Sequence, residues 1–253
     1  MKITLKINKS VHENAARYYQ QAKEAKEKLD GLKKAIEETK KEMIKAEKKA
    51  KENKKLVKIR KDKKWFEKMH WFLTCNGNLA IGGRNAQQND LVFSRHMEDK
   101  DLFFHADIQG GTVVILKDGT GATEEELLET AQFAASFSNA WKNGNASVDV
   151  YAVAKEQLAK HAQGGYIPTG AFAITGERKW FRETKLGLRL GSDEGKLIIL
   201  PDCSKKKLEN EVLIYPAASG KEKGEMTKIL AKRLAIHPDE LMDILPNGKS
   251  KLK

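Results

Sequence analysis

A heptad-spaced apolar seam near the N-terminus constrains this chain most, because it requires one very long helix. Small or apolar side chains recur there at alternating steps of three and four residues, over about six heptads. At ~1.5 Å rise per residue the seam predicts a helix roughly 65 Å long. Gly31 is a weak point, since glycine costs about 1 kcal/mol inside a helix, but the seam keeps its register there. The seam consists of Ala15, Tyr18, Ala22, Ala25, Leu29, Leu32, Ile36, Thr39, Met43, Ala46, Ala50, Asn53 and Val57.

The segment before the seam has a different pattern. Residues Lys2–Ile7 alternate polar and apolar side chains, which predicts a short half-buried strand. Asn8 and Ser10 then offer side-chain oxygens that can cap the start of the helix. A seam also needs a partner helix, because a helix that is polar on its other sides gains little stability alone.

Positive charge is concentrated on the same segment. The chain has a net charge of +12 and a pI of about 9.4. Residues 20–64 contain eighteen Lys and Arg against nine Asp and Glu, which is most of the excess. Such a field suits a phosphate-rich partner. The alternative is that these lysines only solvate a helix face.

The stretch from Trp65 to Gly119 predicts a sheet with polar side chains at its strand ends. Two apolar runs bracket the hairpin turn signal Asn76-Gly77, and two later runs read as strands of the same sheet. These four runs are Trp71–Leu73, Leu79–Ile81, Leu102–Phe104 and Val113–Leu116. Two polar segments lie where strands end, at 82–89 and 101–107. Loops at strand ends usually carry binding groups.

The rest of the chain predicts a mixture of helices and strands. Thr123 and Glu126 form a capping-box pattern that opens a helix, and basic and short helices are expected at 225–234 and 238–245. Strands are expected at 148–153, 171–175, 186–190, 197–200 and 212–216, with a polar turn at 176–183. The fold class is therefore α+β: a short strand and coiled-coil helix over 1–64, then a mixed α/β domain with a C-terminal helical extension over 65–253.

The polar segments give little indication of a catalytic site. His105 and Asp107 share one face of a strand and could move protons, orient a ligand phosphate, or bond within the fold. No nucleophile has a recognisable setting, and Cys75 and Cys203 lack the spacing of a zinc site or a disulfide framework. We expect no catalytic residue, metal or cofactor. No apolar run reaches the length of a membrane span, so no membrane partner is expected.

Several of these residue types suit RNA instead. Arg84 after Gly82-Gly83 can hold a phosphate through two hydrogen bonds. Gln87, Gln88 and Asn89 have donors and acceptors for sugars or base edges, or they close a turn. The glycine-rich segment 164–170 could cradle a phosphate or form a hairpin.

The chain resembles the NFACT family of ribosome-associated quality-control factors, in the region called NFACT-R. The matching blocks are Trp65–Lys68, Trp71-Phe72, Gly82–Arg84, Gln87–Asn89, Asp101, His105–Asp107 and Gly110, then Lys160, Pro168–Gly170 and Phe172. The resemblance is to archaeal members and covers roughly the whole chain, as the C-terminal half of such a protein. The RNA-binding residues it suggests are Arg84, Gln87, Gln88, Asn89, His105, Asp107, Lys117, Lys160, Thr169 and Gly170.

The resemblance implies a cytoplasmic, non-enzymatic module that binds tRNA and rRNA on obstructed large ribosomal subunits. Family members support template-free tailing of the stalled chain, while the ribosome makes the peptide bonds. The implied partners are the large subunit, tRNA and the N-terminal NFACT half in cis or in trans, with weak homodimerisation through the helix. Two alternatives stay open: an RNA-modification accessory or enzyme acting on tRNA, and a coiled-coil adaptor that binds only protein.

Overall fold

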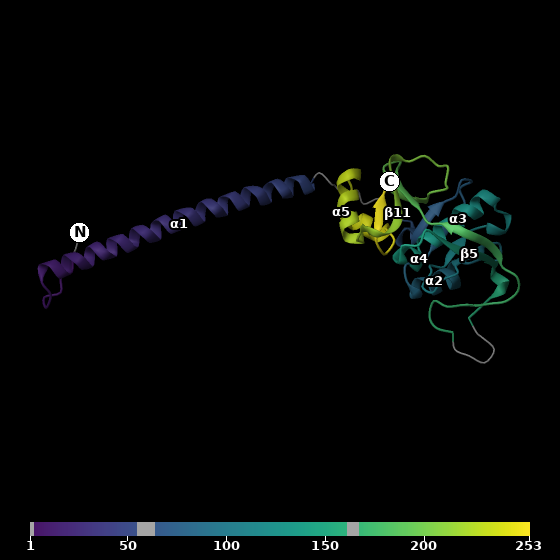
Figure 1. Cartoon of the computed structure of the whole chain (residues 1–253), viewed down its shortest axis with the longest axis horizontal. Helices are drawn as coiled ribbons and strands as arrows, with labels where there is room; N and C mark the ends of the chain where they lie inside the picture. The colour runs from purple at the N-terminus through teal and green to yellow at the C-terminus, as the bar shows by residue number, and fades with distance from the viewer. Residues whose placement is uncertain (1–2, 55–63, 161–166) are drawn as a thin grey trace. The chain divides into compact units, whose positions relative to one another are not determined.

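The computed structural model describes residues 3–54, 64–160 and 167–253, in two compact units, residues 1–58 and 59–253 (Figure 1). The first unit contains helix α1 (Val11–Lys54), which continues through Gly31 without a break. Ser10 Oγ accepts a hydrogen bond from Glu13 N, and the Glu13 carboxylate accepts one from Ser10 N in return. This reciprocal pair satisfies two groups at the start of the helix. The single long helix is confirmed. The predicted domain boundary at 64/65 borders residues 55–63, which lie outside the described residues, as does Val57 of the seam.

The predicted N-terminal strand is wrong for the residues that can be described. Residues 3–6 have no strand structure, and a turn follows them. Thr4 bonds through its N and O to the hydroxyl of Tyr18, and Lys6 N donates to Asn14 Oδ1. A strand needs a neighbouring strand for its backbone groups, and here side chains of α1 take that place.

The second unit is built on a six-stranded antiparallel sheet in the order β1-β2-β4-β3-β5-β8. Its strands are β1 (His70–Leu73), β2 (Leu79–Gly82), β3 (Leu102–Ala106), β4 (Val114–Leu116), β5 (Ser147–Ala154) and β8 (Lys179–Lys185). The β1–β2 hairpin turns at Gly77, whose φ of 88° favours glycine. The hairpin and the two later strands that the sequence predicts are confirmed.

The two faces of this sheet are covered unequally. Helix α3 (Glu124–Ser136) packs across β3, β4, β5 and β8 and buries one face in a core that includes Phe72, Phe104 and Phe181. Helix α2 (Ala86–His96) packs on β2 and covers part of the other face, where Phe103 and Tyr151 lie. Alternate residues of a strand point to opposite faces. Therefore Phe103, His105 and Tyr151 point to this second face, where Phe103 and Tyr151 are buried and His105 is partly buried.

A second, four-stranded sheet follows in the order β10-β9-β11-β12. Its strands are β9 (Leu188–Asp193), β10 (Lys196–Pro201), β11 (Glu209–Lys221) and β12 (Ser250–Leu252). The remaining elements are α4 (Asn139–Asn143), α5 (Lys223–Leu234), α6 (Pro238–Ile244), the short pair β6 (Leu158–Ala159) and β7 (Ala173–Ile174), and the 3-10 turns η1 (Trp65–Lys68), η2 (Gly119–Gly121) and η3 (Lys155–Gln157). Trp141 Nε1 on α4 donates to Ser250 Oγ on β12 over 3.1 Å, which ties α4 to this sheet.

Three elements differ from the sequence expectation. The segment around Gln87–Asn89 is the start of helix α2 and not a loop. The polar segment 176–183 contributes most of β8, an edge strand whose polar side chains face solvent. The C-terminal residues, for which no element is predicted, pair as β12 with β11.

Candidate functional site

A cleft of about 850 Å³ opens within the second unit. It is bounded by the sheet, the start of α2, the loop at 168–172 and the α5–α6 region. This size is in the range of small-molecule and cofactor sites. Of the residues that the sequence predicts, Arg84, Asn89, His105, Thr169 and Gly170 line it, whereas Gln87, Gln88, Asp107, Lys117 and Lys160 do not.

Arg84 enters the cleft because the chain before it approaches α2 closely. A side chain at Gly83 would place its Cβ 2.3 Å from Asn89 Oδ1, so only glycine fits there. The Arg84 guanidinium donates weakly to Met69 O over 3.4 Å and lies 3.9 Å from the Asp243 carboxylate. Its Nε is buried without a protein partner. Burial lowers the pKa of Arg84 and Asp243 opposes the shift, but a guanidinium stays charged in proteins. Arg84 therefore has donor capacity left for a ligand.

Two histidines line the same cleft, and each has a buried Nδ1 without a protein partner, His70 and His105. His70 stacks on Phe137 with ring centroids 3.9 Å apart. Burial, then the charges of Arg84 and Lys223, hold the pKa of His70 well below its usual range. Burial also lowers the pKa of His105, although nearby backbone groups and Asp107 oppose it. Both rings are therefore neutral at pH 7 and can donate or accept one hydrogen bond to a ligand.

Lys223 adds a second cation on the α5 side. Burial, then the charge of Arg84, lowers the pKa of Lys223. Its Nζ donates to Asn247 Oδ1 over 3.1 Å. Among the residues that line the cleft, Arg84 and Lys223 face one carboxylate, Asp243. The cleft is therefore positive and suited to an anionic group.

The predicted amides build the local structure next to the cleft. Asn85 Oδ1 accepts from Gln88 N and so caps α2. Gln88 Oε1 accepts from Arg84 N over 3.0 Å, and Asn89 Oδ1 accepts from Val113 N over 3.3 Å. These contacts support the alternative that Gln88 and Asn89 hold the turn, while Gln87 is exposed.

Lys160 and Gly170 hold the 168–172 loop against α2. Asp90 Oδ1 accepts from Gly170 N over 3.0 Å and is ion-paired with Lys160. Lys160 Nζ also donates to Ala171 O over 3.0 Å. Gly170 has a φ of 82°, and a Cβ there would lie 2.8 Å from Ala86 Cβ. The loop is therefore locked in place at the cleft wall. The predicted glycines 164 and 165 lie outside the described residues.

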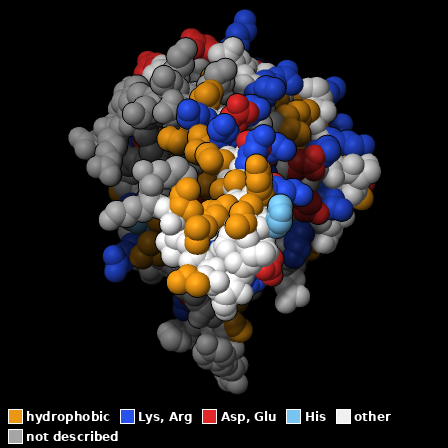
Figure 2. All heavy atoms as spheres, turned by 90° about the vertical axis from the view of Figure 1, so that its left-hand side faces the viewer, with side chains coloured by type: hydrophobic (Ala, Val, Ile, Leu, Met, Phe, Trp, Pro, Cys, Tyr) orange, Lys and Arg blue, Asp and Glu red, His pale blue; other side chains and the backbone are white. Residues whose placement is uncertain are grey.

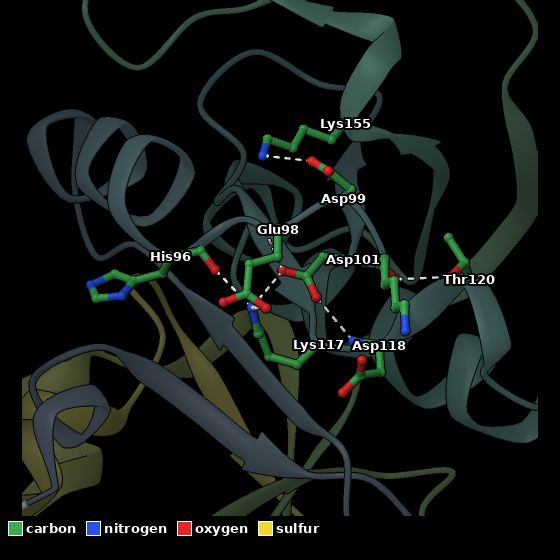
Figure 3. Close-up of polar contacts among 9 residues, drawn as sticks. His96, Glu98, Asp99, Asp101, Lys117, Asp118, Thr120 and Lys155 are labelled. Atoms are coloured by element: carbon green, nitrogen blue, oxygen red, sulfur yellow. Dashed lines mark hydrogen bonds and ion pairs between the residues drawn. The ribbon is translucent and has the colours of Figure 1, made fainter.

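Lys117 belongs to a separate polar cluster, shown in Figure 3. Its Nζ donates to Asp101 Oδ2 over 2.7 Å and to His96 O over 2.9 Å, and it lies 3.2 Å from Glu98. Asp101 is buried and also accepts from Asp118 N and Glu98 N. Lys117 thus neutralises a buried carboxylate and braces the ends of α2, β3 and β4.

Sequence reasoning missed His70, Lys223 and Asp243. Each comes from a different element, and a single histidine, lysine or aspartate in a strand or helix gives no signal of its own. Asp107 is exposed, and among the described hydrogen bonds none joins it to His105, so no histidine–carboxylate pair is formed. Within the described residues, no three His, Cys, Asp or Glu side chains gather as metal ligands would. None of the described helices has the length and apolar composition of a membrane span.

Comparison with known proteins points to one family. Residues 68–176 match the family model described as "NFACT protein RNA binding domain". The archaeal Rqc2 homolog aRqcH of Methanocaldococcus jannaschii is 39% identical over 201 residues, which cover 76% of this chain and 30% of that protein. The ribosome quality control complex subunit NEMF homolog of Drosophila melanogaster is 37% identical, over 70% of this chain and 18% of that protein. Human NEMF is 34% identical, over 66% of this chain and 16% of its own length. The chain therefore spans less than a third of each of these relatives.

Proposed function

We propose that this chain is an RNA-binding module of ribosome-associated quality control. It contains a match to the NFACT RNA-binding domain. It is also homologous over most of its length to one part of the Rqc2 and NEMF ribosome quality-control proteins. It binds the obstructed large subunit with its peptidyl-tRNA in the cytoplasm and supports template-free tailing of the stalled chain. It acts by binding and positioning RNA, and not as an enzyme.

The observation that carries this proposal is the positive cleft. Arg84 and Lys223 lie in it with one carboxylate, and three buried nitrogens there have no protein partner: His70 Nδ1, Arg84 Nε and His105 Nδ1. Buried polar atoms are usually paired, so such a group of nitrogens suits a ligand rich in oxygen acceptors, such as a phosphate and ribose. The described part of α1 adds exposed lysines, and on the face shown in Figure 2 Lys and Arg side chains are spread among apolar ones.

RNA binding is expected to weaken steeply with salt. Each phosphate contact by Lys or Arg releases counterions, so the slope of log affinity against log salt scales with the number of contacts. For about four contacts to single-stranded RNA, affinity should fall roughly fifty-fold between 50 and 200 mM salt. Fluorescence anisotropy with a labelled tRNA across a salt series measures the slope. A flat dependence, or no binding at low salt, contradicts the proposal.

Arg84→Ala and His105→Ala are each expected to weaken association with tRNA and with large subunits, by about five- to tenfold or more. Both side chains line the cleft and keep a buried nitrogen without a protein partner, so their loss is expected to remove ligand contacts. Co-sedimentation with stalled large subunits and thermal unfolding are measured together. Lys207→Ala, an exposed cation outside the cleft, is the matched control. If a variant loses thermal stability in step with binding, that residue is structural.

A further inference from the structure

Three aromatic side chains form a row across the face of the six-stranded sheet that holds the second core cluster. His105 on β3 is the direct cross-strand partner of Tyr151 on β5, and Tyr151 is the partner of Trp180 on β8. Their ring centroids are 5.9 Å and 5.5 Å apart. Phe103 continues the row beside His105 at 6.3 Å, and Phe172 packs on Phe103 at 5.3 Å. These five residues are called the aromatic track below.

Cations lie over the rings of this track. The Arg178 guanidinium is 4.6 Å from the Tyr151 centroid and 5.8 Å from that of Trp180. Arg182 lies 4.0 Å over the Trp180 ring. Among the described ion pairs, Arg182 pairs with Asp149 and none involves Arg178. A guanidinium has five N–H donors, and among the described hydrogen bonds only Arg182 Nη1 is bonded, to Asp149, so Arg178 and Arg182 keep donors available for phosphates.

The track is continuous with the cleft. Phe103, His105, Tyr151 and Phe172 line the cleft, whereas Trp180 and the two arginines lie on and beside the edge strand β8. The surface therefore runs from a positive pocket at Arg84 and Lys223 to an edge strand that has cations and an indole. Tyr151 is 7% exposed and lies beneath the Arg178 guanidinium. Trp180 is only half-buried, so part of its side chain is accessible to solvent.

Rings and guanidinium planes in a row on a sheet are the surface on which unpaired bases stack. A duplex cannot use such a surface, because its bases are already stacked and paired inside the helix. An acidic peptide would use the cations but gain nothing from the rings. Of these three ligands, only a nucleic acid with exposed bases can contact the rings, the cations and the pocket at the same time.

We propose that the aromatic track and the cleft form one binding site for single-stranded RNA, an inference that rests on the proposed function. Bases stack on Trp180 and on the guanidinium of Arg178 above Tyr151, and phosphates meet Arg178 and Arg182. The strand continues into the cleft, where one nucleotide meets Arg84, His105 and Lys223. The module therefore selects unpaired segments of ribosomal or transfer RNA and not helical ones.

The test is fluorescence anisotropy of the full chain with labelled eight-nucleotide adenosine and uridine RNA oligomers and with a blunt RNA duplex of the same length. Single strands are expected to bind at least tenfold more tightly than the duplex. Trp180→Ala is expected to weaken single-strand binding about tenfold or more, and Trp180→Phe is expected to restore most of it, since stacking needs only a flat ring. Arg178→Gln weakens single-strand binding, and Lys207→Gln, the exposed control, does not change the preference.

Thermal unfolding of every variant separates lost contacts from lost structure, and Arg178→Gln keeps the test valid if Trp180→Ala is unstable. Three results would overturn the inference: equal affinity for single strand and duplex, normal binding by a folded Trp180→Ala together with unchanged binding by Arg178→Gln, or equal competition by polyglutamate. In these cases RNA binding itself, and so the proposed function, still stands. Failure of the unaltered chain to bind any RNA overturns both.

Discussion

Glu126→Gln is expected to lower the free energy of unfolding of the second unit by about 3 kcal/mol, because one pKa unit corresponds to about 1.4 kcal/mol. Burial raises the pKa of this carboxylate, but hydrogen bonds outweigh burial and bring it from 4.5 to about 2. The donors are Thr123 N, Thr123 Oγ1, Thr74 Oγ1, Asn76 Nδ2 and Asn78 Nδ2, at 2.7–3.1 Å. Glutamine keeps one acceptor oxygen and turns an amino group toward donors, so it leaves several of these groups unpaired.

The sign of the pH dependence follows from the lowered pKa. The folded state holds the carboxylate ionised, so its contribution is complete above pH 4.5 and is lost as the pH falls toward about 2. Urea unfolding of both proteins at several pH values should therefore show a difference that is largest near neutral pH and shrinks in acid. Glu124→Gln is the matched control: it lies in the same helical turn, is 65% exposed, and should change stability by less than about 1 kcal/mol. A Glu126→Gln protein as stable as the control at pH 7 would contradict the prediction.

Glu126 also shows which part of the fold can be predicted from sequence. The capping box with Thr123 is local, three residues apart, and the sequence predicts it correctly. The other three donors lie in the turn of the β1–β2 hairpin, about fifty residues earlier in the chain, and no spacing rule connects them to α3. Glu126 therefore anchors this hairpin, whose first residue, His70, lines the cleft.

Elements that lack a strong periodic pattern were harder to predict. Helix α2 has polar residues at 87–89, whose composition indicates a loop, but Gln88 and Asn89 accept hydrogen bonds from Arg84 N and Val113 N, and only Gln87 is exposed. The sequence predicts a polar turn at β8 because most side chains of this edge strand are polar and exposed, without a regular apolar alternation. The strand nevertheless holds Trp180, which the sequence alone did not single out.

Only some of the residues that the sequence predicts for the site line the cleft, for a related reason. Arg84 and His105 stand beside glycines and strand ends, which mark close approach of the backbone. Lys117 has the same residue type as an RNA contact, but its ammonium is bonded to Asp101. The sequence shows that a residue is a cation but not what it binds. It therefore cannot distinguish a lysine that pairs with a buried carboxylate from one that is available to bind a ligand.

The apolar stripe on α1 leads to the second large prediction. Leu29, Leu32, Ile36 and Met43 of the seam are 56%, 61%, 54% and 59% exposed. Burying a leucine or isoleucine contributes roughly 1.5–3 kcal/mol, so a complementary helix is expected to pair tightly with this stripe. Alanines make the seam narrow, and flanking lysines repel an identical parallel helix. Self-association is therefore expected to be weak.

The partner we expect is the N-terminal half of an NFACT protein, supplied as a separate chain. Sedimentation velocity over a concentration series should show weak dimerisation of this chain alone and a stable complex on mixing. Leu32→Glu should weaken that complex at least tenfold, because it places a charge in the buried seam. Gln21→Glu adds the same charge at an exposed position outside the seam and should leave pairing unchanged. A chain that stays monomeric, keeps its full helix content and does not bind the N-terminal half would show that α1 needs no partner and that its stripe is only a solvated face.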